Sequence, residues 1–269
     1  MPVCGVFGTL LSFPAPFYSW KYIMLDLVEI YDNYLLNNNK LHQKKRYDGK
    51  EKWFHASSSG MCARKHYFQH IAGVRPKQVG SDTMRLFRLG DLIHNDIQDA
   101  LRKYAEKNGS RIYIEREIRL PDVNVRGFLD IIVIEDGILY DIKTCNTWKW
   151  KTLFGRYPNP NPTTNYQTQL GTYGWWYEND SGKKLKKMTL LFYNKDTSKM
   201  RDLDVSTSYI RTAQDYWHDV NERYKKGNPP IELGIAPVYK WECKWSTGIC
   251  GFYEVCGGGL DKEKGDNNL

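Results

Sequence analysis

The stretch "GFLDIIVIEDGILYDIKT", residues 127–144, contains two apolar segments separated by Asp136-Gly137. An Asp-Gly pair favours a two-residue type I′ turn, because both central positions of that turn require a positive φ. The stretch therefore predicts an antiparallel β-hairpin. In the register that this turn imposes, the opposing pairs are Ile132 with Asp141 and Asp130 with Lys143.

Charged side chains gather on one face of this apolar hairpin. Side chains alternate along a strand, so Asp130, Asp141 and Lys143 emerge on the same side. Mg²⁺ and Mn²⁺ prefer carboxylate oxygens, and a nearby ammonium can hold a water or stabilise charge on a phosphate. This set is typical of metal-assisted phosphodiester hydrolysis. The alternative is an ordinary cross-strand ion pair between Asp130 and Lys143.

The composition is that of a folded, basic protein. The chain has 269 residues, 41% hydrophobic and 14% aromatic content, and a formal net charge of +8. Such a chain can bury a sizeable core, and its charge favours a polyanionic partner such as nucleic acid. It has neither an apolar run of 18 residues nor a basic n-region of a signal peptide at its start. We therefore expect a cytoplasmic or intracellular, DNA-associated protein with no membrane segment.

Hydrophobic periodicity predicts an α/β fold, with a central mixed β-sheet flanked by helices. Helices are expected over 25–38, from residue 60 or 61, and over 83–107, 165–179 and 208–227; strands are expected over 111–120, 186–194 and 200–205. We expect four regions: a variable helical segment (1–50), a folded core domain (51–240), a cysteine segment (241–256) and a flexible tail (257–269). We expect residues 1–23 to be dispensable, and the cysteine segment to join the N-terminal helix that carries Cys62.

Two further motifs flank the hairpin. "GDLIHNDIQ" carries His94 in the long helix, and "QLGTY" carries Gln169 and Tyr173, which share one helix face. Each motif also has an ordinary structural interpretation. His94 can be a histidine at the core or its rim, and Gln169 and Tyr173 can lie on a helix edge whose polar groups are satisfied by local contacts.

In this order, with "GFLD" and "DIKT", the motifs resemble the RecB-type branch of the PD-(D/E)xK nuclease superfamily, over residues 56–256. The resemblance implies a restriction-endonuclease-like fold and a Mg²⁺- or Mn²⁺-dependent DNA exonuclease. It implies that His94, Asp130 and Asp141 bind metal, that Lys143 is catalytic, and that Gln169 and Tyr173 support the site.

Three of the six cysteines, Cys243, Cys250 and Cys256, crowd near the C-terminus. A closed tetrahedral site or a cubane cluster needs a fourth ligand, for which Cys62 is the candidate. The arrangement resembles the iron–sulfur nucleases that include the CRISPR-associated exonuclease family, and implies a structural [4Fe-4S] cluster. Ser246 stands where that family usually has the second cysteine of a C-x-x-C pair, and thiolates suit zinc equally, so zinc is the runner-up.

Basic and aromatic residues accompany these motifs. Arg64 and Lys65 follow Cys62, and Trp148 and Lys149 follow the catalytic strand. Cations neutralise phosphates and aromatic rings stack on unpaired bases, so this mixture predicts binding of single-stranded DNA or DNA ends. Two other hypotheses stay open: a DNA-end-binding or recombination protein that does not cleave, and a zinc-stapled interaction protein.

Overall fold

The computed structural model describes residues 26–47, 53–225, 242–245 and 248–256. The predictions for residues 1–23 and 257–269 lie outside these ranges. A six-stranded mixed sheet forms the centre, in the order β1-β3-β4-β5-β6 with β2 also paired to β3. Its strands are β1 (Phe54–His55), β2 (Ile112–Leu120), β3 (Val125–Val133), β4 (Ile138–Cys145), β5 (Lys187–Asn194) and β6 (Met200–Val205). The pairs β1·β3 and β4·β5 are parallel and the others antiparallel.

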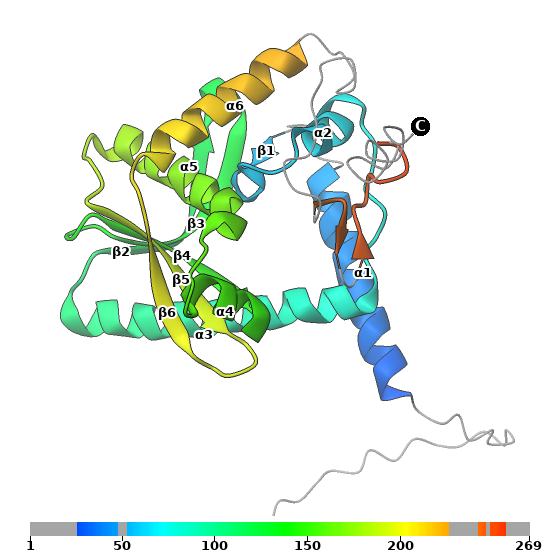
Figure 1. Ribbon diagram of the computed structural model, residues 1–269, viewed down its shortest axis with the longest axis horizontal. Coiled ribbons are helices and arrows are strands. Elements are labelled where there is room, and N and C mark those ends of the chain that lie inside the picture. Colours follow the sequence, from blue (N-terminus) through cyan, green and yellow to red (C-terminus); the bar gives the residue numbers. More distant parts are fainter. Residues whose placement is uncertain (1–25, 48–52, 226–241, 246–247, 257–269) are drawn as a thin grey trace, which may run out of the picture.

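Helices cover both faces of the sheet, as the sequence predicted. Figure 1 shows α5 and α6 side by side on one face, and α3 running along the other. The helices are α1 (Leu27–Tyr47), α2 (Ala63–His66), α3 (Ser81–Asn108), α4 (Thr147–Phe154), α5 (Thr164–Ser181) and α6 (Tyr209–Lys225). None of the helices in the described ranges is long and apolar enough to cross a membrane.

The core lies between the sheet and the pair α5–α6. Strand β5 reads as a nearly continuous apolar run, because a strand in a parallel pair is covered on both faces, whereas β4 also carries Asp141, Lys143 and Thr144. The indole of Trp217 on α6 is fully buried, and its N–H donates to the hydroxyls of Ser59 and Thr172. These bonds satisfy polar groups that would otherwise be costly inside the core.

Helix α5 lies against the start of α6 at a glycine. An added Cβ on Gly171 would lie 2.1 Å from the backbone oxygen of Tyr209. Only a residue without a side chain allows this approach. Gly171 lies midway between Gln169 and Tyr173, so the same contact fixes the position of both side chains.

The hairpin register differs from the prediction by two residues. The structure pairs Val133 with Ile138 and Ile131 with Tyr140, around a four-residue turn in which Gly137 N donates to Val133 O at 2.9 Å. Of the turn residues, only Gly137 has a positive φ, at +63°. A type I′ turn needs two such residues, so the two-residue turn was wrong. Because strand side chains have period two, the shift leaves the face unchanged. The ladder ends at Ile131–Tyr140, and its register, continued by one residue, aligns Asp130 with Asp141 instead of Lys143.

Three helical elements also differ from the sequence expectation. Helix α1, expected to end at residue 38, extends to Tyr47. The helix expected from residue 60 or 61 begins at Ala63, is four residues long and runs into a single π-helical turn, Tyr67–Ile71. Helix α4 was not predicted; the side chain of its N-cap, Asn146, accepts a hydrogen bond from Lys149 N at 2.9 Å.

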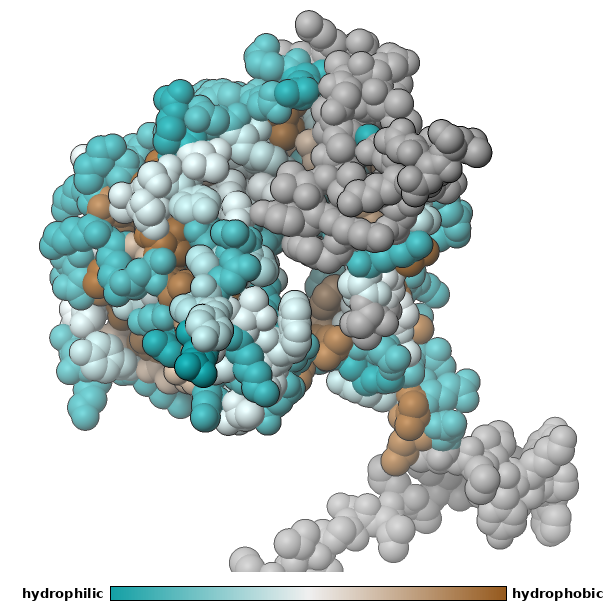
Figure 2. Space-filling model, viewed as in Figure 1, coloured by the Kyte–Doolittle hydropathy of each residue, from teal (hydrophilic) through white to brown (hydrophobic). Residues whose placement is uncertain are grey.

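The described surface is mostly hydrophilic. Figure 2 shows teal residues over much of the α/β body and a hydrophobic patch at the start of α1. Three exposed residues of that helix, Leu27, Val28 and Ile30, account for the patch.

Candidate active site

A gap in strand pairing opens the sheet at Asp130. On one edge, β3 pairs with β1 only at Val125 and Arg126, and with β4 only from Ile131 onward. The residues between these two ladders have no strand partner on that edge. Asp130 lies at the point where β4 diverges, so the gap forms the floor of a cleft.

The cleft has a cavity volume of about 260 Å³ and gathers polar side chains from β1, α3, β3, β4 and α5. Its lining consists of His55, Ser57, His94, Gly127, Phe128, Asp130, Asp141, Lys143, Gln169 and Tyr173. All six residues predicted for the nuclease site are among them. The alternating pattern of the hairpin, and the spacing of the two helical motifs, are therefore compatible with one site.

Asp130 is buried and already engaged on one oxygen. Its Oδ2 accepts a hydrogen bond from Ile142 N at 2.7 Å and lies 3.6 Å from His94 Nδ1. Burial, and then the neighbouring Asp141 carboxylate, raise the pKa of Asp130 to about 8. Burial, and then the Lys143 ammonium, lower the pKa of His94, which favours the neutral imidazole that a metal requires.

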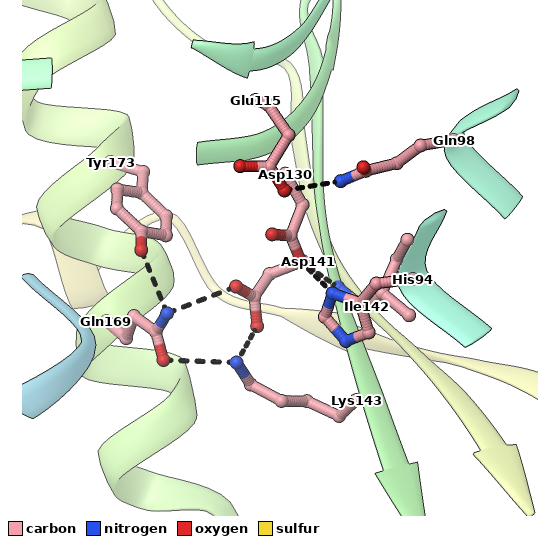
Figure 3. A network of polar contacts seen from close by, with 9 residues as sticks. All are labelled: His94, Gln98, Glu115, Asp130, Asp141, Ile142, Lys143, Gln169 and Tyr173. Atoms are coloured by element: carbon pink, nitrogen blue, oxygen red, sulfur yellow. Dashed lines mark hydrogen bonds and ion pairs between the residues drawn. The ribbon is translucent and has the colours of Figure 1, made fainter. Parts of the chain in front are cut away.

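Asp141 lies at the centre of a hydrogen-bonded network, shown in Figure 3. Its Oδ2 lies 2.6 Å from Lys143 Nζ, and Gln169 Nε2 donates to its Oδ1 at 3.3 Å. The oxygen of the same amide, Gln169 Oε1, accepts a hydrogen bond from Lys143 Nζ at 3.1 Å. Gln169 Nε2 also donates a hydrogen bond to Tyr173 Oη at 2.9 Å. Both ends of the Gln169 amide are thus used, which fixes its orientation.

The Lys143 side chain carries its charge inside the protein. Burial lowers the pKa of this lysine, but Asp141 and Asp130 outweigh that effect and leave the pKa raised. Burial also raises the pKa of Tyr173 well above its usual range, so its hydroxyl is neutral. The site therefore offers two carboxyl groups, an ammonium and a hydroxyl in one cleft.

The donor set suits a hard divalent cation. Mg²⁺ keeps several waters and is usually bound through one or two carboxylates, which Asp130 and Asp141 can supply. As the side chains stand, no group of three His, Cys, Asp or Glu within the described ranges is arranged to hold a metal ion. The chemistry of the pair thus fits, although the structure holds no ready-made three-ligand cage in the part it describes.

Two neighbours of Asp130 escaped the sequence analysis. Glu115 on β2 lies opposite Asp130, between the pairs Ile114–Ile131 and Arg116–Leu129, and has a left-handed φ of +53°. Gln98 on α3 is fully buried and donates to Glu115 Oε1 at 2.8 Å. Gln98 follows His94 by four residues, so helical spacing could have indicated it. Nothing in the sequence signals the left-handed φ at Glu115.

The four cysteines of the predicted cluster line a second, narrow pocket with a cavity volume of about 20 Å³. Cys62 is the N-cap residue of α2, and Cys243 and Cys250 are joined by a hydrogen bond from Cys250 N to Cys243 O at 2.9 Å. A short hairpin, β7 (Lys244–Trp245) with β8 (Gly248–Ile249), lies between them. None of the four forms a disulfide.

A buried acid accompanies these thiols. Glu242 Oε1 accepts a hydrogen bond from Cys62 N at 2.6 Å and lies 3.9 Å from Lys65 Nζ. Burial, and then Glu242, raise the pKa of Cys62 to about 12. Arg64 is also buried, and its Nη1 lies 3.7 Å from Cys256 Sγ. Arg64 thus faces the cysteine pocket and has little surface to offer a phosphate, unlike the role predicted for it.

Of the other residues predicted to contact DNA, Lys65 lies on α2, with its Nζ 3.9 Å from Glu242 Oε1, and Trp148 and Lys149 lie on α4. Trp148 is 73% exposed. Lys149 Nζ lies 4.3 Å from the centroid of the Tyr166 ring, and Lys143 Nζ lies 4.9 Å from the same centroid. Tyr166 therefore connects α4 to the lysine of the cleft, and sequence reasoning did not single it out.

Comparison with known proteins supports the fold. No family model and no curated protein matches the chain. The crystal structure of SSO0001 matches with a TM-score of 0.51 and 18% identity, covering 88% of this chain and all of that one. An alkaline exonuclease from Laribacter hongkongensis matches at 0.42 and 13%, covering 71% and 97%. A phage-related exonuclease from Haemophilus somnus matches at 0.40 and 11%, covering 61% and 79%. The likeness to SSO0001 shows a shared fold.

Proposed function

We propose that this protein is a metal-dependent deoxyribonuclease that hydrolyses phosphodiester bonds at single-stranded DNA or DNA ends. One observation carries the proposal: Asp130 and Asp141 face the same open cleft, with the Lys143 ammonium 2.6 Å from Asp141 Oδ2. Two carboxyl groups beside a half-buried ammonium suit the binding of Mg²⁺ or Mn²⁺ next to a phosphate, because a bound cation displaces the proton that Asp130 otherwise holds.

Asp130, Asp141 and His94 would hold the metal. When bound, the cation would polarise the phosphate and lower the pKa of a bound water to generate the nucleophile. Lys143 stays charged and can orient the attacking water or stabilise the charge that develops on the phosphate. Gln169 holds Lys143 and Asp141 at a fixed separation, and Tyr173 fixes the amide of Gln169.

Labelled single-stranded and duplex DNA should be incubated with Mn²⁺, with and without a chelator. We expect cleavage that needs the metal, its loss in Asp141→Ala, and DNA binding that is largely unchanged. Asp136→Ala is a matched control, because Asp136 is an exposed aspartate in the turn of the same hairpin.

Metal-dependent cleavage that persists in Asp141→Ala would overturn the assignment of the site. DNA binding by the wild type without any product would point to a non-cleaving, end-binding protein instead.

A [4Fe-4S] cluster held by Cys62, Cys243, Cys250 and Cys256 is the second part of the proposal. Four thiols lining one pocket supply the donor set that such clusters use. The cluster would be structural, because it would tie the C-terminal segment to the N-terminus of α2. Its binding would displace the protons of the thiols and draw the four sulfur atoms together.

Iron, sulfide and zinc should be measured in protein purified without oxygen. We expect broad absorption near ~400 nm from iron–thiolate bonds, and its loss in Cys250→Ser. Cys145→Ser is the control, because Cys145 is a buried cysteine that does not line this pocket. A colourless protein that contains zinc would exclude the iron–sulfur cluster and leave the nuclease proposal untouched.

A further inference from the structure

The aromatic ring of Phe128 lies beside the candidate active site and is exposed to solvent. Phe128 is 47% exposed, although its neighbour Leu129 is fully buried and the residues that follow it on β3 are buried as well. It lines the same cleft as Asp130 and Asp141. Exposed large apolar residues are common on this surface, so the position of Phe128 in the cleft, rather than its exposure alone, sets this ring apart.

The strand pattern explains the exposure. Phe128 falls in the gap of β3 between the ladder with β1 and the ladder with β4. It precedes Asp130 by two residues, so both side chains leave the same face of the strand. The ring therefore borders the place where a phosphate would meet the carboxylates.

Basic side chains continue this surface away from the cleft. Arg126 precedes Phe128 by two residues, and Arg119 on β2 is its cross-strand partner. Both surround Glu117: Arg119 Nη2 lies 3.1 Å and Arg126 Nε 3.9 Å from its Oε1. Two guanidinium groups against one carboxylate leave a net positive charge. The Arg119 guanidinium also lies 5.8 Å from the centroid of the Trp53 ring.

We propose that Phe128 is a stacking platform for an unpaired base next to the scissile phosphate, and that Arg126 and Arg119 hold the phosphates of the adjoining nucleotides. This inference rests on the proposed function and specifies its substrate class as single-stranded DNA. Alternation of aromatic rings and cations is the arrangement that binds unpaired strands without reading their sequence.

The preference for an unpaired strand follows from geometry. In a duplex, each base is stacked between its neighbours, so its faces are covered. A single ring at the floor of a cleft reaches a base face only when that base has left the stack. Stacking of a base on an aromatic side chain changes affinity by roughly 5- to 150-fold.

The experiment is a double-mutant cycle that combines protein variants with DNA variants. DNA affinity is measured in the presence of a chelator, and the cleavage rate is measured with Mn²⁺. The proteins are the wild type and Phe128→Ala; the single strands are a normal oligonucleotide and a series with one abasic site at successive positions from the end. We expect Phe128→Ala to weaken binding of the normal strand by roughly 5- to 150-fold, and to have no further effect with one of the abasic strands. Tyr104→Ala is the control, a 57% exposed aromatic on α3 that does not line the cleft.

An equal loss with every abasic strand would overturn the inference, because the effect would then not depend on a base. No loss with the normal strand, or an equal loss with blunt duplex DNA, would overturn it too. A wild type that shows the expected cycle in binding, but cuts no substrate with Mn²⁺, would refute the proposed nuclease activity and retain the stacking site.

Discussion

The close approach of α5 and α6 leads to a quantitative prediction for Gly171→Ala. The new Cβ would lie 2.1 Å from Tyr209 O and 2.5 Å from Tyr209 C. Both atoms belong to the backbone and cannot rotate away. Normal contact between non-bonded heavy atoms is ~3.5 Å or more, so the two helices must separate locally by about 1 Å.

Two effects of opposite sign determine how much Gly171→Ala changes the free energy of unfolding. Alanine favours a helix over glycine by about 1 kcal/mol. Overpacking a core costs about 1–3 kcal/mol, and more where the neighbours cannot move. Because the obstacle here is backbone, we expect a net loss of roughly 2 kcal/mol in the free energy of unfolding. For a chain of this size that loss corresponds to a fall in Tm of roughly 4–8 °C.

Gly90→Ala is the matched comparison. Gly90 is inside α3, and its added Cβ would meet only the Thr144 hydroxyl oxygen, at an ordinary 3.6 Å. The helix preference then acts alone, so we expect a gain of up to about 1 kcal/mol. Urea denaturation of both variants, followed by circular dichroism, measures the difference directly.

Gly171→Ala should also lower DNA cleavage under conditions where the protein stays folded, because Gln169 and Tyr173 lie two residues to either side of the displaced backbone. If Gly171→Ala proves as stable as Gly90→Ala, the described contact between α5 and Tyr209 is incorrect. The inference that this contact positions the two side chains would then be withdrawn as well.

Two further substitutions test polar groups in the core, each by thermal and urea denaturation. In Gln98→Met we expect a rise of about 1 kcal/mol in the free energy of unfolding, because Gln98 Oε1 is buried without a hydrogen-bond partner among the described residues, and exposed Glu115 can exchange its bond for water. A fall of similar size would show that the Gln98–Glu115 bond stabilises the fold. In Trp217→Phe we expect a loss of about 2–4 kcal/mol, because the variant leaves a cavity and removes a donor to two buried hydroxyls. Trp148→Phe should change stability by less than about 0.5 kcal/mol, since Trp148 is exposed; equal effects in the two tryptophan variants would contradict this account.

The cysteine pocket shows where local reasoning was sufficient and where it was not. The crowding of three cysteines led us to expect a metal or iron–sulfur site with Cys62 as the fourth ligand. The four residues line one pocket, and the cluster itself stays a prediction. The sequence did not predict that the Arg64 side chain faces this pocket. The residues next to it in the sequence do not indicate that the C-terminal segment packs against α2.

The amino-acid sequence by itself determined the class of fold and the face of the hairpin on which Asp130, Asp141 and Lys143 lie. Both depend on local periodicity: apolar positions repeat at helical or strand spacing, and side chains of a strand alternate whatever its register. That is why a register error of two residues left the candidate site intact.

Only the tertiary structure decided which part of β3 lacks a strand partner on one edge, and therefore where the cleft opens. It also decided that Glu115 adopts a left-handed φ opposite Asp130, that Gln98 supports Glu115, and that Phe128 stays exposed. These features depend on contacts between segments that are distant in the chain, and on a turn whose length the Asp-Gly pair alone does not specify. A local pattern carries no information about such contacts, because they form only when β1, β4 and α3 meet around β3.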